Sequence, residues 1–232
     1  ADHAEAKLKR ALWDRLLREV YGAEVGDDRL FLQHTYLTIV AKTIAARVFE
    51  LDEDDPARLL SGAALEEQGI HGAVEADFFD WVLHHAEGPD LVRRLAKQAS
   101  RFHLRDVRED VLKALYESLM DPEQRKDLGE YYTPDWLAAR LVARAVEQPL
   151  SDRVLDPACG SGTFLFHAIR RLRAAATEAG WEAPKRVAAC EALVRGLDVH
   201  PVAVIIARVT WLLALGEDIQ SREGTVTVPV FL

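Results

Sequence analysis

One short stretch, VLDPACGSGTFLF at residues 154–166, constrains the fold of this chain more than any other. Small residues lie between two apolar runs, which predicts a strand, a tight turn and the start of a helix. Pro157 disfavours helical backbone at Asp156, so we expect the chain to turn there. Gly160 and Gly162 can adopt positive φ and let a ligand approach the backbone. The stretch therefore predicts a ligand turn at the carboxyl end of a strand, where open α/β sheets bind their ligands.

The pattern after residue 128 alternates between strands and helices. Strand-like runs lie at 153–156, 195–200 and 225–231, and helical patterns cover 162–179, 184–193 and 201–215. Alternation of this kind predicts a parallel sheet with right-handed crossovers. The fold class expected is therefore α/β for this part of the chain.

The first 128 residues have the spacing of helices instead. Apolar residues recur every three or four positions from Leu8 to Val20, and the more apolar stretch 28–50 predicts a buried central helix. Glycines interrupt residues 61–90, which predicts short helices and loops. Residues 90–120 predict a long helical stretch or two helices. We therefore expect an all-helical N-terminal domain at 1–128 and an α/β domain at 129–232.

Composition excludes several classes of protein. The formal net charge of −9 gives no bulk attraction to phosphates, and no apolar run is long enough to cross a membrane. Two cysteines without a CxxC pair favour a reducing cytoplasmic setting. The chain begins at Ala1 and stops within a strand-like run, which we interpret as a piece excised from a longer protein.

Two clusters of charged residues each admit two interpretations. The basic residues of 90–120 indicate either contact with a nucleic-acid backbone or, as we favour, a solvated helix face paired with acidic residues. Acidic and histidine side chains at 75–85 resemble a metal cluster. No helical spacing brings three good ligands together there, so we expect surface polar residues and no metal site. The residues concerned are Arg93, Arg94, Lys97, Arg101, Arg105, Arg108 and Lys113 in the first cluster, and Glu75, Asp77, Asp80, His84 and His85 in the second.

The ligand turn does not match the two common phosphate-binding loops. The Walker pattern GxxxxGK[ST] is absent, and Leu165 stands where the dinucleotide fingerprint GxGxxG needs its third glycine. The next acidic signal, Asp198, follows Gly160 by 38 positions, against the roughly 20 of a dinucleotide fold. An acid directly before the turn also repels phosphate. Asp156 is better suited to a ligand with a cationic group.

The stretch DPACGSGTF closely resembles motif I of S-adenosylmethionine-dependent DNA methyltransferases, above all the N6-adenine enzymes of restriction-modification systems, including type I modification subunits and type IIG enzymes. GEYYTP at 129–134 resembles motif X, and GLDVHP at 196–201 resembles motif II. The order of the three motifs is that of the family. The resemblance covers 129–232 well and the first 128 residues loosely.

The resemblance implies a Rossmann-like methyltransferase domain and a role for each motif residue. Asp156 and the turn residues Ala158, Gly160 and Gly162 are expected around the methionine part of S-adenosylmethionine. Asp198 is expected to accept hydrogen bonds from the ribose hydroxyls, with Val199 and Pro201 against the adenine ring and His200 at the rim. Thr133 and Pro134 suit the start of a helix whose N–H groups receive the cofactor carboxylate. The residues expected to assist there are Tyr131, Tyr132 and Thr133. Cys159 is expected to pack rather than react.

The family transfers the methyl group at a [DN]PP[YFW] motif, and these 232 residues contain none. We therefore expect no catalytic residue here, weak cofactor binding at most, and DNA as the partner of the full-length protein. In the family fold the fourth strand pairs with the first. If only three strands are present, the first strand is an open edge, which we expect the helical half or a second copy to shield. The alternatives are a methyltransferase of the same fold acting on cytosine N4, RNA or protein glutamine, and a non-catalytic interaction or cofactor-binding module.

Overall fold

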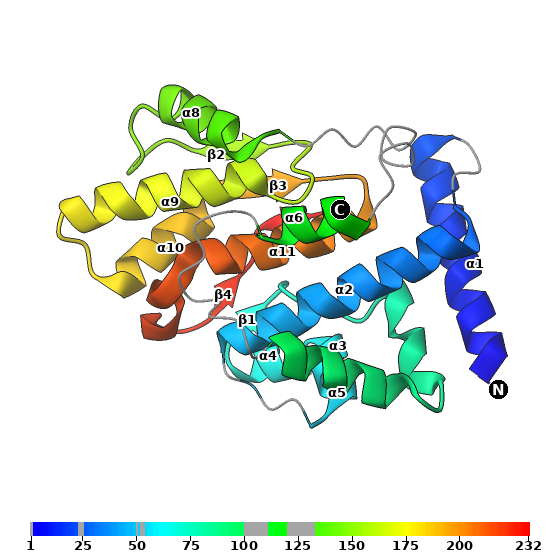
Figure 1. Ribbon diagram of the computed structural model, residues 1–232. Helices are drawn as coiled ribbons and strands as arrows, with labels where there is room; N and C mark the ends of the chain where they lie inside the picture. The colour runs from blue at the N-terminus through cyan, green and yellow to red at the C-terminus, as the bar shows by residue number, and fades with distance from the viewer. Residues whose placement is uncertain (1, 23–25, 50, 52–53, 100–110, 120–132) are drawn as a thin grey trace.

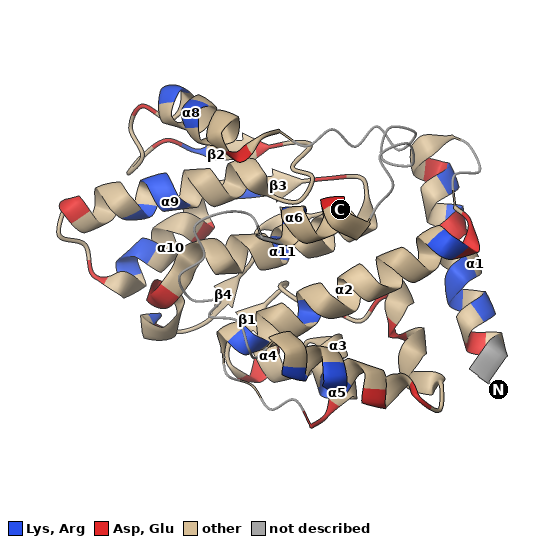
Figure 2. Cartoon of the chain, in the orientation of Figure 1, with Lys and Arg blue, Asp and Glu red and all other residues tan. Residues whose placement is uncertain are grey.

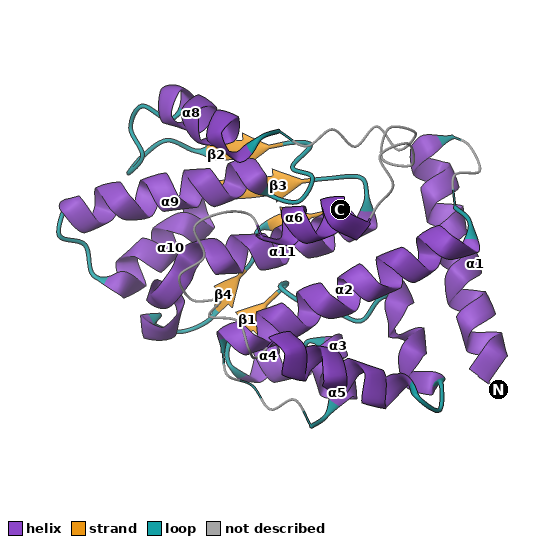
Figure 3. Cartoon of the chain, in the orientation of Figure 1, coloured by secondary structure: helices purple, strands orange, loops and turns teal. Residues whose placement is uncertain are grey.

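The computed structural model describes residues 2–22, 26–49, 51, 54–99, 111–119 and 133–232 (Figure 1). Helices dominate, and short parallel strands lie between them (Figure 3). The boundary expected at residue 128 lies outside the described residues. The helices of the first half are α1 (Asp2–Tyr21), α2 (Asp28–Val48), α3 (Pro56–Ser61), α4 (Ala63–Glu67), η1 (Phe78–His84), α5 (Gly88–Ala99) and α6 (Val111–Leu119).

The second half alternates as the sequence predicts. The helices after the gap are α8 (Asp135–Ala145), α9 (Thr163–Glu178), α10 (Ala183–Leu193), α11 (Pro201–Leu215) and η3 (Gly216–Ser221). Three strands, β2 (Val154–Asp156), β3 (Val194–Leu197) and β5 (Val230–Phe231), form a parallel sheet in the order β2-β3-β5. This confirms the parallel pairing and places the first strand of the motif region at an edge of the described sheet.

Two expectations about strands are wrong. The run 225–231 is not one strand, because β4 (Val226–Thr227) and β5 belong to different sheets. Pro229 lies between them and has no N–H to continue a ladder. The first half is not all helical either, since β1 (Ile70–His71) pairs in parallel with β4.

The two faces of the three-stranded sheet differ in exposure. Val194 and Val230 are buried on the face against which α9 and α11 pack. On the other face Leu155 is 59% exposed, Leu197 38% and Phe231 46%. Parallel sheets usually have both faces covered. The cover that we expected from the helical half is not found at Leu155, and β3 is the strand that pairs with β2 among the described residues.

One core and several polar contacts join the two halves. α2 lies along α11 (Figure 1), and a single cluster of buried apolar residues extends from Trp13 to Val230. Arg208 of α11 pairs with Glu75 at 2.7 Å between Nη1 and Oε2. Gln220 donates to the carbonyl of Val48 at 2.6 Å. The halves are therefore packed on each other rather than linked only by the chain.

A buried lysine organises the helical half. Lys42 of α2 is 1% exposed, and its Nζ donates to the carbonyls of Leu60 and Glu75, each at 2.8 Å. The same Nζ lies 2.9 Å from carboxylate oxygens of both Asp77 and Asp80. Two members of the cluster that resembled a metal site are thus bound to a lysine. Among the described residues no group of three metal-ligating side chains occurs.

Candidate functional site

The ends of β2 and β3 bring two aspartates to one turn. Asp156 is the last residue of β2, and Asp198 follows the end of β3. β3 ends at Leu197, so the strand expected through residue 200 is shorter than predicted. His200 is instead the N-cap of α11. The parallel register places Asp156 beside Gly196, which explains why both acids reach the same end of the sheet.

Asp198 holds the turn together through backbone hydrogen bonds. Its Oδ2 accepts from the N–H of Gly160 at 2.8 Å, and its Oδ1 accepts from the N–H of His200 at 2.8 Å. The N–H of Cys159 donates to the carbonyl of Leu197 at 2.9 Å. Gly160 has a φ of 53°, as the turn requires. The second acid therefore shapes the first turn.

Only one of the two carboxylate oxygens of Asp156 accepts a hydrogen bond from a described residue. Oδ1 accepts from the N–H of Ala158 at 3.2 Å, whereas the buried Oδ2 has no hydrogen-bond partner. Burial raises the pKa of Asp156, the bond from Ala158 opposes the shift, and the charge of Asp198 adds to it. Neither aspartate makes an ion pair within the part of the chain that the structure describes. A cationic donor would satisfy this oxygen.

Two glycines allow the close packing under the turn. Gly162 is buried with a φ of 91°, and an added Cβ would lie 3.1 Å from the Cα of Ala207 in α11. Gly196 of β3 would bring a Cβ within 2.6 Å of the side chain of Leu165. Gly196 was not among the predicted site residues. It begins the stretch GLDVHP and lies one residue before the end of β3. Gly162 thus packs against α11 rather than only facing a ligand.

Cys159 is a packing residue, as predicted. Its side chain is buried, and burial, followed by the charges of Asp198 and Asp156, raises the pKa of its thiol to about 12. A thiol with such a pKa stays protonated near neutral pH and is a poor nucleophile.

The structure describes only some of the residues predicted to receive the cofactor carboxylate. Thr133 is half-buried, and Tyr131 and Tyr132 lie outside the described residues. The buried Lys113 of α6 donates to the carbonyl of Thr133. Pro134 is the N-cap of α8 rather than its first residue.

Around motif II, exposure follows the expectations only in part. Val199 is 65% exposed and available to a ligand, whereas Pro201 is buried. His200, expected at the rim, is only 3% exposed because it packs against the helical half.

The basic stretch 90–120 makes internal contacts where it is described. Arg93 pairs with Asp90 at 2.6 Å, and Lys113 is buried rather than solvated. Arg101, Arg105 and Arg108 lie outside the described residues. In α5 the one acid, Asp90, lies in the first turn, and the exposed Arg93, Arg94 and Lys97 follow it (Figure 2). The described part of this stretch thus leaves both interpretations open.

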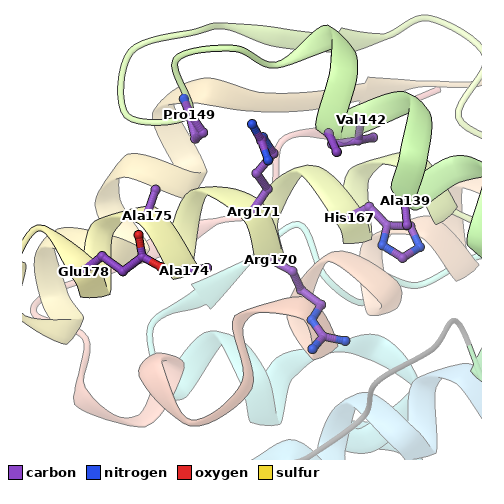
Figure 4. A pocket seen from close by; sticks show the side chains of 10 residues that line it. Ala139, Val142, Pro149, His167, Arg170, Arg171, Ala174, Ala175 and Glu178 are labelled. Atoms are coloured by element: carbon purple, nitrogen blue, oxygen red, sulfur yellow. The ribbon is translucent and has the colours of Figure 1, made fainter.

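A hollow lies between α8 and α9, away from the turn. Its volume is about 460 Å³, and alanines of both helices, His167, Arg171 and Glu178 line it (Figure 4). Arg171 donates to the carbonyl of Val146 at 2.8 Å, and His167 lies 2.9 Å from Asp135. None of the predicted site residues lines this hollow.

Comparisons with known proteins match part of this chain. Residues 107–217 match the family model described as N-6 DNA Methylase. This part of the chain is similar to the N-6 DNA methylase family. It contains Asp156, Asp198 and the turn between them, and the match confirms the resemblance drawn from the three motifs.

Two curated relatives share part of this chain. Over 108 residues the chain is 32% identical to "Adenine-specific methyltransferase PglX" of Streptomyces coelicolor. The matched residues make up 43% of this chain and 9% of that protein. Over 91 residues the chain is 34% identical to "Type I restriction enzyme MjaVIII methylase subunit" of Methanocaldococcus jannaschii, covering 38% and 15%. The chain thus spans only a small part of either relative's length. No solved structure matches it significantly.

Within the matched residues 107–217, the structure describes α6 and everything from Thr133 to the end of the match. No helix of the described residues is both long and apolar enough to cross a membrane.

Proposed function

We propose that this chain is the cofactor-binding part of a DNA methyltransferase that transfers a methyl group from S-adenosylmethionine to adenine N6 in a restriction-modification or phage-defence system. The observation that carries the proposal is the pair Asp156 and Asp198 at one turn of the segment that matches the N-6 DNA methylase family. We take the β2-β3-β5 sheet to be the first part of a Rossmann-like methyltransferase domain.

The residues at the turn fit the cofactor. The buried Oδ2 of Asp156 lacks a partner and suits the cationic amino group of the methionine part. The exposed Ala158 leaves the backbone of the turn accessible. Asp198 and the exposed Val199 lie together after β3 and suit the ribose and the adenine. Thr133 lies before α8, whose N-terminus favours the carboxylate. When bound, S-adenosylmethionine supplies an activated methyl group.

We propose that this chain does not transfer the methyl group by itself. Its 232 residues contain no [DN]PP[YFW] stretch. The second candidate function, a non-catalytic cofactor-binding module within a larger protein, requires that the full-length protein lacks this stretch as well. A methylation assay of the full-length protein on DNA and on RNA separates the two functions. It also tests transfer to cytosine N4, because the product nucleoside identifies the atom modified.

Calorimetry with S-adenosylmethionine and with its demethylated product tests the site. We expect weak binding by the chain and its loss in Asp156→Ala and in Asp198→Ala. Glu178→Ala is the matched control, because this carboxylate lies on α9 in the hollow of Figure 4, away from the turn. Binding that is unchanged in both turn variants would refute the site.

We further propose that DNA is the partner of the full-length protein and that this chain self-associates through the open edge of β2. Support for self-association comes from the place of β2 at an edge of the described sheet and from its exposed Leu155. Sedimentation over a range of concentrations should show a dimer that Leu155→Lys dissociates. A monomer at all concentrations would contradict it.

Both cysteines are free, which fits the reducing cytoplasm that we propose.

A further inference from the structure

His200, which follows Asp198 beside the ligand turn, packs against rings of the helical half, among them Tyr21 of α1 at 6.1 Å between centroids. Its ring and that of His34 of α2 lie edge to face, with centroids 5.1 Å apart and planes at 85°. His34 is 0% exposed and His200 3%. The contact therefore forms inside the core, between helices that belong to different halves of the chain.

His34 is enclosed by aromatic rings on its other sides. Trp13 of α1 lies 5.6 Å away at 82°, and Phe79 of η1 lies 6.4 Å away at 87°, both measured between ring centroids. Neither ring nitrogen of His34 makes a hydrogen bond to any residue that the structure describes. The imidazole therefore acts through its shape and its ring contacts. Edge-to-face packing of this kind fixes the relative orientation of two rings.

His200 in turn is part of the backbone that orients Asp198. Its N–H donates to Oδ1 of Asp198 at 2.8 Å, and its Nδ1 accepts from the N–H of Ala203 at 3.2 Å, which caps α11. Oδ2 of Asp198 then holds the N–H of Gly160. A shift of the His200 ring would therefore move the cap, the carboxylate and the turn together.

Both imidazoles are neutral in the folded protein. Burial lowers the pKa of His34 well below its ordinary value, and the neighbouring His200 lowers it further. Burial also lowers the pKa of His200 to about 4, against a smaller opposing effect of Asp198. The two rings therefore pack at neutral pH without repelling each other.

We propose that His34 is a positioning residue of the ligand turn: through its ring contact with His200 it fixes Asp198 and Gly160, so that the helical half sets the affinity of the site. The part that concerns the cofactor rests on the function proposed above. The part that concerns the turn does not, because it describes the protein without ligand.

Amide hydrogen exchange of the cofactor-free protein tests the proposal directly. In His34→Ala we expect exchange at the Gly160 and His200 amides to be faster by about tenfold, within the range of mutational coupling effects. His34→Phe keeps a ring in place and should stay near the unsubstituted protein. Ile39→Ala is the matched control, because Ile39 is equally buried on α2 but packs in a separate cluster with Leu59 and Leu60.

The same variants are then compared in calorimetry with the demethylated cofactor. We expect three- to tenfold weaker binding in His34→Ala, with His34→Phe and Ile39→Ala close to the unsubstituted protein. Where His34→Ala does not fold, His34→Leu removes the ring and keeps most of its volume.

The proposal is overturned if His34→Ala leaves the two amides unchanged, if Ile39→Ala accelerates them equally, or if His34→Phe behaves as His34→Ala. Failure of the unsubstituted protein to bind cofactor would contradict the proposed function alone. The exchange data would still decide whether His34 positions the turn.

Discussion

Two pairs of aspartates lie in this protein, and their surroundings are opposite. Asp77 and Asp80, in the helical half, share the ammonium of Lys42 at 2.9 Å. Asp156 and Asp198, at the ends of β2 and β3, accept only backbone N–H groups in the described structure, and one oxygen of Asp156 has no partner. The first pair is bound to a lysine of the same chain. The second pair makes no ion pair with any described residue.

The difference separates structural acids from acids that await a ligand. A buried carboxylate costs free energy unless it is paired. In the helical half Lys42 offsets part of that cost within the chain, although burial still raises the pKa of Asp77. At the turn no ion pair among the described residues offsets the cost of burial, which raises the pKa of Asp156. A cationic ligand would offset it there. Four experiments follow, from the largest expected effect to the smallest.

Lys42→Met should cause the largest loss of stability. It leaves two buried carboxylates and two carbonyls without their donor, and breaking a buried ion pair from one side costs about 3–5 kcal/mol. Denaturant unfolding measures the loss. Adding Asp77→Asn and Asp80→Asn should recover part of it. A loss below about 1 kcal/mol would show that the first pair does not depend on its cation.

Asp198→Ala should have an intermediate effect on the cofactor-free protein. It removes the acceptor of two backbone N–H groups, in a partly buried setting, at a cost of about 1–2 kcal/mol. Denaturant unfolding again gives the value, with Asp198→Asn expected to lose less because its amide keeps one acceptor. A cost equal to that of Lys42→Met would remove the distinction between the pairs.

Asp156→Asn should leave stability unchanged or raise it by up to about 1 kcal/mol, because it removes a charge that burial disfavours. The same variant should lose cofactor binding, since a neutral amide cannot replace the carboxylate toward a cationic group. Thermal unfolding and calorimetry on one preparation test both statements. A clear loss of stability would place Asp156 with the structural acids.

The pH dependence of stability should carry a small contribution from Asp156. Its folded pKa lies above the unfolded value of 3.8, so the folded protein keeps the proton to higher pH than the unfolded chain. The contribution of this group to stability therefore falls as pH rises through the window above 3.8. Subtracting the pH profile of Asp156→Asn from that of the unsubstituted protein isolates it. A difference that increases with pH would contradict the shift.

Sequence reasoning located the turn because its signals are local. A proline after Asp156, two glycines and an apolar helix start all act within a few residues, and the structure has a strand, turn and helix there. The parallel pairing of the three strands could be predicted because helices alternate with them along the sequence. Position 198 also came from a local pattern, although β3 ends before it.

Contacts between distant segments were not predictable in this way. Lys42 is a lone charged residue in an apolar helical stretch, and nothing near it in the sequence indicates that Asp77 and Asp80 will surround it. The burial of His200 depends on α2, which lies far away in the sequence. The pairing of β1 with β4 joins two-residue strands, too short for a periodic pattern to appear.

The pairing of β1 with β4 also bears on how the protein reaches its fold during synthesis. Ile70 emerges from the ribosome long before Val226, its partner across the ladder. The apolar surface of α2 is covered earlier, when α11 emerges, and the ladder closes last. Chaperone binding to nascent chains should therefore be strongest before α11 emerges and weaken before this ladder closes.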